Sequence, residues 1–206
     1  MNLFLRNTAA NNEDASTFLV VGLGNPGREY RETRHNIGFM VIDRLGETLN
    51  CKLMKVQSKA IIGITKLEGN KIILAKPQTY MNLSGQAVSA LAHFYKIGLD
   101  HIIVAHDDVD LPFGQIRMRP GGGSAGQKGI ASIIERLGSQ DFARLRMGIG
   151  RPPGQREAAD YVLKTFSKAD AEFLPEFINR GAEAVRSFII EGIDNAMNRF
   201  NPKQQV

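Results

Sequence analysis

Four polar residues have side chains that together could activate a water molecule: Asn25, His35, Asn82 and Asp107. Because a histidine titrates near neutral pH, His35 can accept a proton from water. A carboxylate such as Asp107, hydrogen-bonded to the other ring nitrogen, would fix the tautomer and stabilise the imidazolium. The carboxamides of Asn25 and Asn82 can donate hydrogen bonds to a developing oxyanion. Since no serine or cysteine has an obvious basic partner, these residues favour direct attack by water.

The four residues follow predicted strands or lie in adjacent loops, and parallel strands gather ligand sites at their carboxyl ends. Each residue also has a plainer interpretation when it is considered alone. Asn25 before Pro26 suits a turn, His35 could begin a helix, and Asp107 could be a solvated carboxylate. Their coincidence with a basic region is what favours a functional site.

Apolar segments alternate with helical patterns along the chain, which predicts an α/β domain with a mostly parallel or mixed sheet flanked by helices. Strands are expected at residues 18–22, 60–65, 71–75, 101–105, 115–119 and 145–149. Helices are expected from residue 36, from residue 83 with Asn82 as N-cap, around 130–137, and over 169–191, where Phe173 belongs to the apolar face. Residues 1–16 are polar and aperiodic, so we expect a disordered N-terminal extension before one domain at 17–206.

Positive charge is concentrated in residues 117–156. The whole chain has a formal net charge of +5, whereas this window alone carries +6. Two acidic residues, Glu135 and Asp141, oppose eight basic ones: Arg117, Arg119, Lys128, Arg136, Arg144, Arg146, Arg151 and Arg156. Such clustering is typical of proteins with a polyanionic partner, most often nucleic acid, although a solvated basic face is the alternative.

Three short patterns approach known ligand-binding motifs without completing them. Residues 22–27 (GLGNPG) match G-x-G-x-x-G, but about ten polar residues precede the next helix, which argues against a dinucleotide site. Residues 121–129 (GGGSAGQKG) lack the lysine and hydroxyl positions of a P-loop, although such a loop can still approach a phosphate. The carboxylates of residues 107–110 could suggest a cation, but this is common loop chemistry, and we expect neither metal nor cofactor.

Composition restricts the class of protein further. The 206 residues are 43% hydrophobic and 23% charged, as in ordinary globular proteins. The single cysteine, Cys51, excludes an intramolecular disulfide and fits a reducing compartment. No apolar run approaches the roughly 18 residues of a membrane-spanning helix. We therefore expect a cytoplasmic protein without a membrane association. We also expect a monomer, because no segment resembles an assembly motif.

The segments around these residues resemble bacterial-type peptidyl-tRNA hydrolases. The resemblance runs from about Phe18 to Asn201 and rests on four motifs in order: VVGLGNPGREYRETRHNIGF, KPQTYMNLSG, AHDDVDLPFGQIR and RLRMGIGRPP. It implies one α/β domain with a mixed sheet. It also implies hydrolysis of the ester that joins a peptide to the 3′ end of tRNA, which recycles tRNA from stalled or prematurely released peptidyl-tRNA.

The resemblance also assigns expected roles to residues of this chain. His35 matches the base that activates water, Asp107 its orienting partner, and Asn25 the residue that separates N-blocked from unblocked aminoacyl-tRNA. Positions that line the substrate channel match Tyr30, Tyr80, Met81 and Asn82. Arg119 and Arg146 match basic positions near the tRNA 5′-phosphate, where the arginine fork of Arg119 replaces a lysine of some members.

The glycine-rich loop departs from the family pattern. Where many members have G-G-H-N-G, this chain has Gln127 in place of the histidine and Lys128 in place of the asparagine that contacts substrate. A lysine cannot accept a hydrogen bond, so Lys128 is expected to bind a phosphate or the 3′-terminal nucleotide electrostatically.

Two other functions remain as alternatives. Relatives on the same scaffold in plant organelles are RNA-splicing factors, so a non-catalytic RNA-binding module is the main alternative. An oxidoreductase with a nicotinamide cofactor would rest on the glycine pattern alone.

Overall fold

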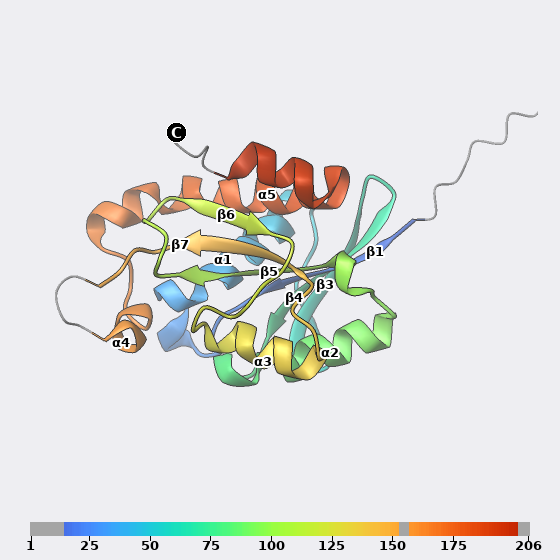
Figure 1. Cartoon of the computed structure of the whole chain (residues 1–206), viewed down its shortest axis with the longest axis horizontal. Coiled ribbons are helices and arrows are strands. Elements are labelled where there is room, and N and C mark those ends of the chain that lie inside the picture. Colours follow the sequence, from blue (N-terminus) through green and yellow to red (C-terminus); the bar gives the residue numbers. More distant parts are fainter. Residues whose placement is uncertain (1–14, 153–156, 202–206) are drawn as a thin grey trace, which may run out of the picture.

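A seven-stranded mixed sheet forms the centre of the protein. The computed structural model describes residues 15–152 and 157–201, so most of the expected N-terminal extension lies outside the described residues. The strands are β1 (Thr17–Gly22), β2 (Lys55–Gln57), β3 (Ala60–Leu67), β4 (Asn70–Pro77), β5 (Ile102–Asp108), β6 (Ile116–Arg119) and β7 (Ala143–Gly148). They lie in the order β2-β3-β4-β1-β5-β7-β6 (Figure 1).

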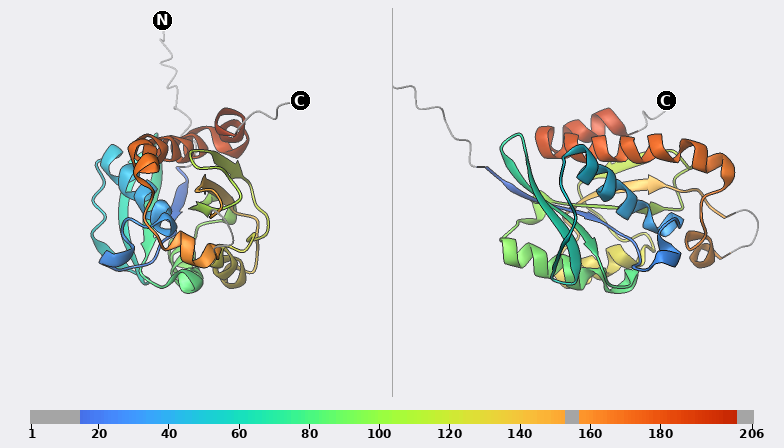
Figure 2. Two further views of the ribbon diagram at one scale, coloured as in Figure 1. Left: turned by 90° about the vertical axis from the view of Figure 1, so that its left-hand side faces the viewer. Right: turned by 180° about the vertical axis from the view of Figure 1, so that it is seen from behind.

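Helices cover both faces of this sheet. They are α1 (Ile37–Thr48), α2 (Ser84–Tyr95), α3 (Lys128–Leu137), α4 (Ala158–Val162) and α5 (Lys168–Phe200), with 3₁₀ turns η1 (Arg28–Tyr30), η2 (Arg34–Asn36), η3 (Met81–Leu83) and η4 (Leu99–His101). Helices α1 and α5 enclose one apolar core against the sheet, and α2 with α3 encloses another on the opposite face (Figures 1 and 2). The expected α/β fold class is confirmed.

The pairing of the strands determines where loop residues meet. Strand β1 is parallel to both β4 and β5, and β5 is parallel to β7. The remaining pairs, β2 with β3, β3 with β4, and β6 with β7, are antiparallel. The loops after β1, β4 and β5 therefore all leave from the same end of the sheet, where the carboxyl ends of these parallel strands lie. This is the arrangement that the sequence predicted for its polar residues.

Several predicted elements differ in the structure. Asn82 is not the N-cap of α2, because a 3₁₀ turn places Leu83 at that position without a side-chain cap. The last helix continues to Phe200 across a non-helical Gly192. Phe173, predicted to be in its apolar face, is 63% exposed. The short elements β2 and α4 were not predicted, since neither is long enough to show a hydrophobic period.

Among the described residues no helix is long and apolar enough to span a membrane.

Glycines allow α1 to cross closely over the end of β1. A Cβ atom on Gly22 would lie 2.2 Å from the carbonyl oxygen of Gly38 and 2.6 Å from Cγ1 of Ile42. A Cβ atom on Gly38 would lie 2.4 Å from the carbonyl oxygen of Ala105 on β5. The first glycine of the G-x-G-x-x-G match thus serves packing between a strand and a helix, and α1 begins only after two 3₁₀ turns.

We expect Gly22→Ala to destabilise the protein by about 1–3 kcal/mol, since the added methyl group must displace backbone atoms of α1. Gly123→Ala is the matched control, because a Cβ atom there meets nothing within 4 Å. Chemical denaturation of both variants measures the difference. Equal stability of the two variants would contradict this account of the crossing.

Strand β5 is buried along its whole length and includes a histidine. His106 is 5% exposed, and its Nδ1 hydrogen-bonds the Asp107 carbonyl oxygen at 2.8 Å. Burial lowers the pKa of His106 below its usual value of 6.5, outweighing the opposing effects of the Asp107 carbonyl and of the carboxylates of Asp107 and Asp108. The neutral imidazole therefore belongs to the folded state at neutral pH.

The lowered pKa of His106 makes a prediction about acid stability. Below about pH 6.5 the unfolded chain binds a proton at His106 that the folded chain does not, so stability falls with decreasing pH until the folded-state pKa is reached. The contribution of one proton is at most about 1.4 kcal/mol per pH unit. His106→Gln should make the free energy of unfolding less dependent on pH in this range. An unchanged slope in denaturation curves would show that His106 does not contribute.

Candidate active site

A pocket of about 540 Å³ opens where the loops after β1, β4 and β5 meet. The first of these loops supplies Asn25, the second Met81, and the end of β5 supplies Asp107. His35 enters from η2, and residues 124–128 close another side at the start of α3. Most of the polar residues singled out in the sequence therefore share one cavity, although they are separated by up to 82 positions.

The imidazole of His35 and the carboxylate of Asp107 form a hydrogen-bonded pair in this pocket. Nδ1 of His35 lies 2.7 Å from Oδ2 of Asp107. The side chain of His35 is 12% exposed and that of Asp107 is 3% exposed, so the pair is shielded from bulk water while the ring still reaches the pocket. An anionic carboxylate requires the proton on Nδ1, which leaves the lone pair of Nε2 available as a base.

Asn25 is held on both its backbone and its side chain. Its backbone N–H donates to Oδ1 of Asn36 at 2.9 Å, and Nδ2 of Asn36 donates to its carbonyl oxygen at 2.9 Å. Its own Oδ1 accepts from the backbone N–H of Met81 at 2.8 Å. The acceptor side of the amide is therefore occupied, and Nδ2 is the group that remains for a ligand in the pocket.

The glycine-rich loop contributes a second partner for Asp107. Gln127 donates from Nε2 to Oδ1 of Asp107 at 3.1 Å, and its Oε1 accepts from the backbone N–H of Ile130 at 2.9 Å. Gln127 is thus the N-cap of α3, whereas the neighbouring Lys128 is exposed at the rim of the pocket.

Helix α4 provides an apolar wall that the sequence did not reveal. Four of its residues or neighbours line the pocket: Ala158, Ala159, Val162 and Leu163. Arg34, next to His35 in the chain, donates from Nη1 to the carbonyl oxygens of Lys164 at 3.3 Å and Thr165 at 2.6 Å. Its guanidinium also lies 4.1 Å from the ring centroid of Tyr161. These contacts attach the α4 segment to the 3₁₀ turn that carries His35.

The residues expected to line the substrate channel separate into two groups. Tyr80, Met81 and Asn82 line the pocket; Met81 is buried, whereas Tyr80 is 63% exposed. Tyr30 does not line it, because η1 places this half-buried residue elsewhere, with its carbonyl accepting from Thr33.

Four arginines of the basic segment 117–156 lie on one face of the antiparallel pair β6–β7, outside the pocket. Antiparallel register sets Arg117 opposite Arg146 and Arg119 opposite Arg144, so all four side chains leave the same face of the ribbon. Arg119 is exposed, whereas Arg146 donates from Nε to Oδ2 of Asp108 at 2.5 Å. The ion pair uses only part of the guanidinium fork.

Arg144 belongs to the scaffold rather than to the exposed basic surface. It is 3% exposed and donates to the carbonyl oxygens of Gly122 at 2.7 Å, Gly123 at 3.2 Å and Gln140 at 3.2 Å. Burial lowers its pKa to about 10, which leaves it charged at neutral pH. This arginine therefore holds the glycine-rich loop in place.

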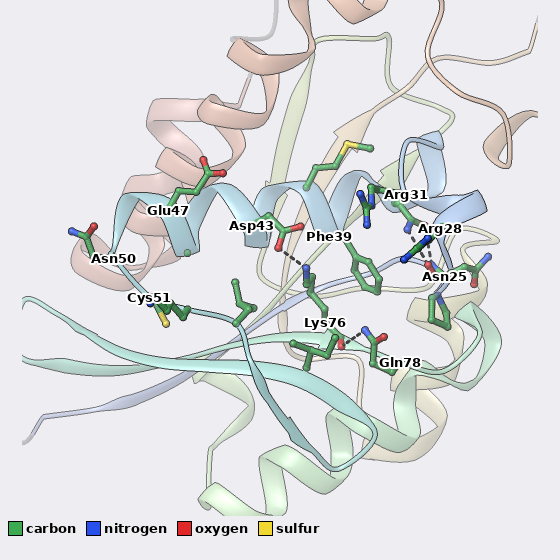
Figure 3. Close-up of a pocket in the computed structure, with 18 residues that line it drawn as sticks. Asn25, Arg28, Arg31, Phe39, Asp43, Glu47, Asn50, Cys51, Lys76 and Gln78 are labelled. Carbon is green, nitrogen blue, oxygen red and sulfur yellow. Dashed lines mark hydrogen bonds and ion pairs between the residues drawn. The ribbon is translucent and has the colours of Figure 1, made fainter.

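A second cleft of about 1030 Å³ lies along α1 and shares Asn25 with the pocket. Arg28 and Arg31 lie near Asn25 at one end, and Lys76 forms an ion pair with Asp43 in the middle (Figure 3). Neither His35 nor Asp107 lines this cleft, so the hydrogen-bonded pair faces the smaller pocket.

The described residues contain no group of three or more His, Cys, Asp or Glu side chains that could hold a metal ion. Asp108 and Asp110 are occupied by the ion pairs to Arg146 and Arg151. These two carboxylates at and just beyond the end of β5 thus have partners within the protein.

Comparisons with known proteins identify the family to which the chain belongs. The family model described as peptidyl-tRNA hydrolase matches residues 19–206. A peptidyl-tRNA hydrolase of Desulforamulus reducens is 52% identical over 185 residues, covering 90% of this chain and 89% of the relative. A chloroplastic peptidyl-tRNA hydrolase of Arabidopsis thaliana is 45% identical over 190 residues, covering 92% of this chain and 66% of the relative. The crystal structure of the Acinetobacter baumannii enzyme superposes with a TM-score of 0.84 at 35% identity, covering 90% of this chain and 94% of that one. The chain therefore belongs to the peptidyl-tRNA hydrolase family.

Proposed function

We propose that this protein hydrolyses the ester between a peptide and the 3′ end of tRNA, releasing both for reuse. The observation that carries the proposal is the His35–Asp107 pair, 2.7 Å from Nδ1 to Oδ2, facing a pocket that also presents Asn25. A base, its orienting carboxylate and a donor amide are the groups that ester hydrolysis by water requires.

The proposed reaction includes two proton transfers, from water to His35 and then from His35 to the leaving ribose oxygen. Nε2 of His35 takes a proton from water as the oxygen attacks the ester carbonyl carbon, and Asp107 stabilises the imidazolium that forms. Collapse of the tetrahedral intermediate breaks the bond to the ribose oxygen, which receives the proton from His35. The products are a peptide with a free carboxylate and a tRNA with a free 3′-terminal hydroxyl. The residues described here require no metal or cofactor for these steps.

Asn25 is proposed to select N-blocked substrates. With Oδ1 bonded to Met81 N–H, its Nδ2 can donate to a peptide carbonyl of the substrate. An unblocked aminoacyl group offers an ammonium in that region, which would leave the amide unpaired and place a cation against a donor. Tyr80, Met81 and Asn82 would bound the aminoacyl group, because they line the same pocket.

The body of the tRNA is proposed to lie against the basic face of the β6–β7 pair. Arg119 and the terminal nitrogens of Arg146 would contact phosphates, and Lys128 at the pocket rim would contact a phosphate or the terminal nucleotide. Such contacts position the acceptor end without reading its sequence, so action on many tRNAs is expected. Tyr30 lies outside the pocket wall, and its contribution would be confined to supporting the adjacent turn.

We also propose that the chain acts as a monomer in the cytoplasm, with residues 17–206 as its one domain. Its bacterial relatives of similar length support this location, although one relative is chloroplastic. The alternative of a non-catalytic RNA-binding module is not supported, since these relatives are named as hydrolases.

Removing either member of the pair should abolish most of the activity. We expect His35→Ala and Asp107→Asn to lower kcat by about 10²–10⁴-fold on N-acetyl-aminoacyl-tRNA, the usual contribution of general base catalysis. Binding of tRNA should persist, because neither residue lies on the basic face. His93→Ala is the matched control, since this histidine is exposed on α2. Turnover by His35→Ala at the native rate would refute the assignment of the base.

The basic face predicts a specific dependence on salt. Arg119→Ala should weaken tRNA binding and reduce the slope of log K against log salt concentration by about 1, the change expected for one lost phosphate contact. Lys66→Ala is the control, because this exposed lysine lies on β3 near the opposite edge of the sheet. If both variants gave the native slope, the tRNA would have to bind elsewhere.

A further inference from the structure

The carboxylate of Asp107 has two neighbours, and only one of them is the base. The imidazole of His35 is hydrogen-bonded to Oδ2, while the side-chain amide of Gln127 donates to Oδ1. A carboxylate on a single partner can rotate about its terminal bond, whereas hydrogen bonds to both oxygens fix its plane. Gln127 therefore supplies the constraint that His35 alone cannot provide.

The orientation of this amide is itself determined by its neighbours. Oε1 of Gln127 accepts from Ile130 N–H in the first turn of α3, and Nε2 faces the carboxylate. Reversing the amide would set N–H against N–H at one end and oxygen against oxygen at the other. Because a glutamine amide does not titrate, this orientation persists over the whole pH range in which the protein is folded.

Tight packing holds the Gln127 side chain in its place. Nε2 also lies 3.4 Å from Sδ of the buried Met81. A Cβ atom on Gly129 would lie 2.5 Å from the same sulfur and 3.1 Å from Oε1 of Gln127. The absence of a side chain at Gly129 thus lets α3 approach closely enough for Gln127 to span from the helix to Asp107.

We propose that Gln127 is a positioning residue for the hydrolysis, which connects the N-terminus of α3 to the His35–Asp107 pair and fixes the Asp107 carboxylate toward His35. The inference rests on the proposed roles of that pair. Gln127 acts through Asp107 and takes no proton itself, so its effect should be on kcat. The chain of contacts runs from the Ile130 N–H through Gln127 and Asp107 to His35.

Other charged or titratable groups near Asp107 either have partners of their own or are exposed to solvent. Asp108 on β5 pairs with Arg146 of β7, and the buried His106 bonds the Asp107 backbone carbonyl. Lys128 on α3 is exposed at the rim, and Arg34 of η2 is bonded to the α4 segment. Among the described residues, the contacts of the Asp107 carboxylate come from His35 and Gln127.

The first experiment removes the contact between Gln127 and Asp107 while keeping an N-cap on helix α3. Serine is a good N-cap, so Gln127→Ser should retain a cap on Ile130 N–H while its short side chain cannot reach Asp107. We expect kcat on N-acetyl-aminoacyl-tRNA to fall about 10–100-fold, the order of loss caused by mispositioned catalytic groups, with KM and the melting temperature close to native. Gln140→Ser, the same change at an exposed position, is the control.

The second experiment uses a readout that a merely structural role would not change. Gln127→Glu has the native shape, and in its protonated form it can donate to Asp107 and accept from Ile130 N–H as the amide does. Once ionised, it sets a second carboxylate against Asp107. The ratio of its kcat to the native kcat should therefore fall as the pH rises from about 5.5 to about 8.5.

Three results would overturn the proposal: native kcat in Gln127→Ser, a loss confined to KM, or a ratio for Gln127→Glu that is constant with pH. A higher KM alone would mean that Gln127 only contacts the substrate. His35→Ala, measured in parallel, distinguishes a failure of the positioning role of Gln127 from a failure of the proposed hydrolase function. If His35→Ala loses activity while both Gln127 variants keep it, the positioning role fails and the proposed function stands. If His35→Ala keeps activity, the proposed function fails first.

Discussion

The hydrogen bond between His35 and Asp107 joins residues that are 72 positions apart in the chain, and the fold must bring them together to within 2.7 Å. Asp107 is fixed by β5, which lies between β1 and β7 in the sheet. His35 is fixed by a 3₁₀ turn just before α1, so its position depends on how closely α1 crosses the sheet. Gly22 and Gly38 allow that crossing, because any side chain there would meet backbone atoms. The glycines thus set the distance between α1, which follows the turn that carries His35, and the strands of the sheet.

The sequence predicted the part of the site that depends on topology. Alternating strands and helices place Asn25, Asn82 and Asp107 after the carboxyl ends of strands in one sheet, and this follows from chain order and hydrophobic pattern. The types of these side chains suggested activation of a water molecule, and the family resemblance then gave each of them an expected role. The α4 wall was missed because a five-residue helix has too few apolar positions to show a period. The N-cap at Asn82 was wrong because an intervening 3₁₀ turn gave that position to Leu83.

Charge was harder to predict, because partners can lie far apart in the sequence. The window 117–156 contains few acids, yet two of its arginines pair with Asp108 and Asp110, which lie just before it. A third, Arg144, is buried and binds carbonyl groups of the glycine-rich loop. A count over a window therefore overestimates the positive surface, whereas the pairing of β6 with β7 defines which arginines share one face.

The neighbouring carboxylates of Asp107 and Asp108 have different kinds of hydrogen-bond partner. Asp108 is matched with the permanent cation of Arg146, so its charge is already compensated and it cannot assist a developing imidazolium. The carboxylate of Asp107 is instead hydrogen-bonded to the imidazole of His35 and to the amide of Gln127, neither of which is a permanent cation. Exchanging these partners would leave the base without an anion to stabilise it. The uncharged character of Gln127 is therefore as important as its geometry, since a cation at that position would hold Asp107 equally well and weaken its effect on His35.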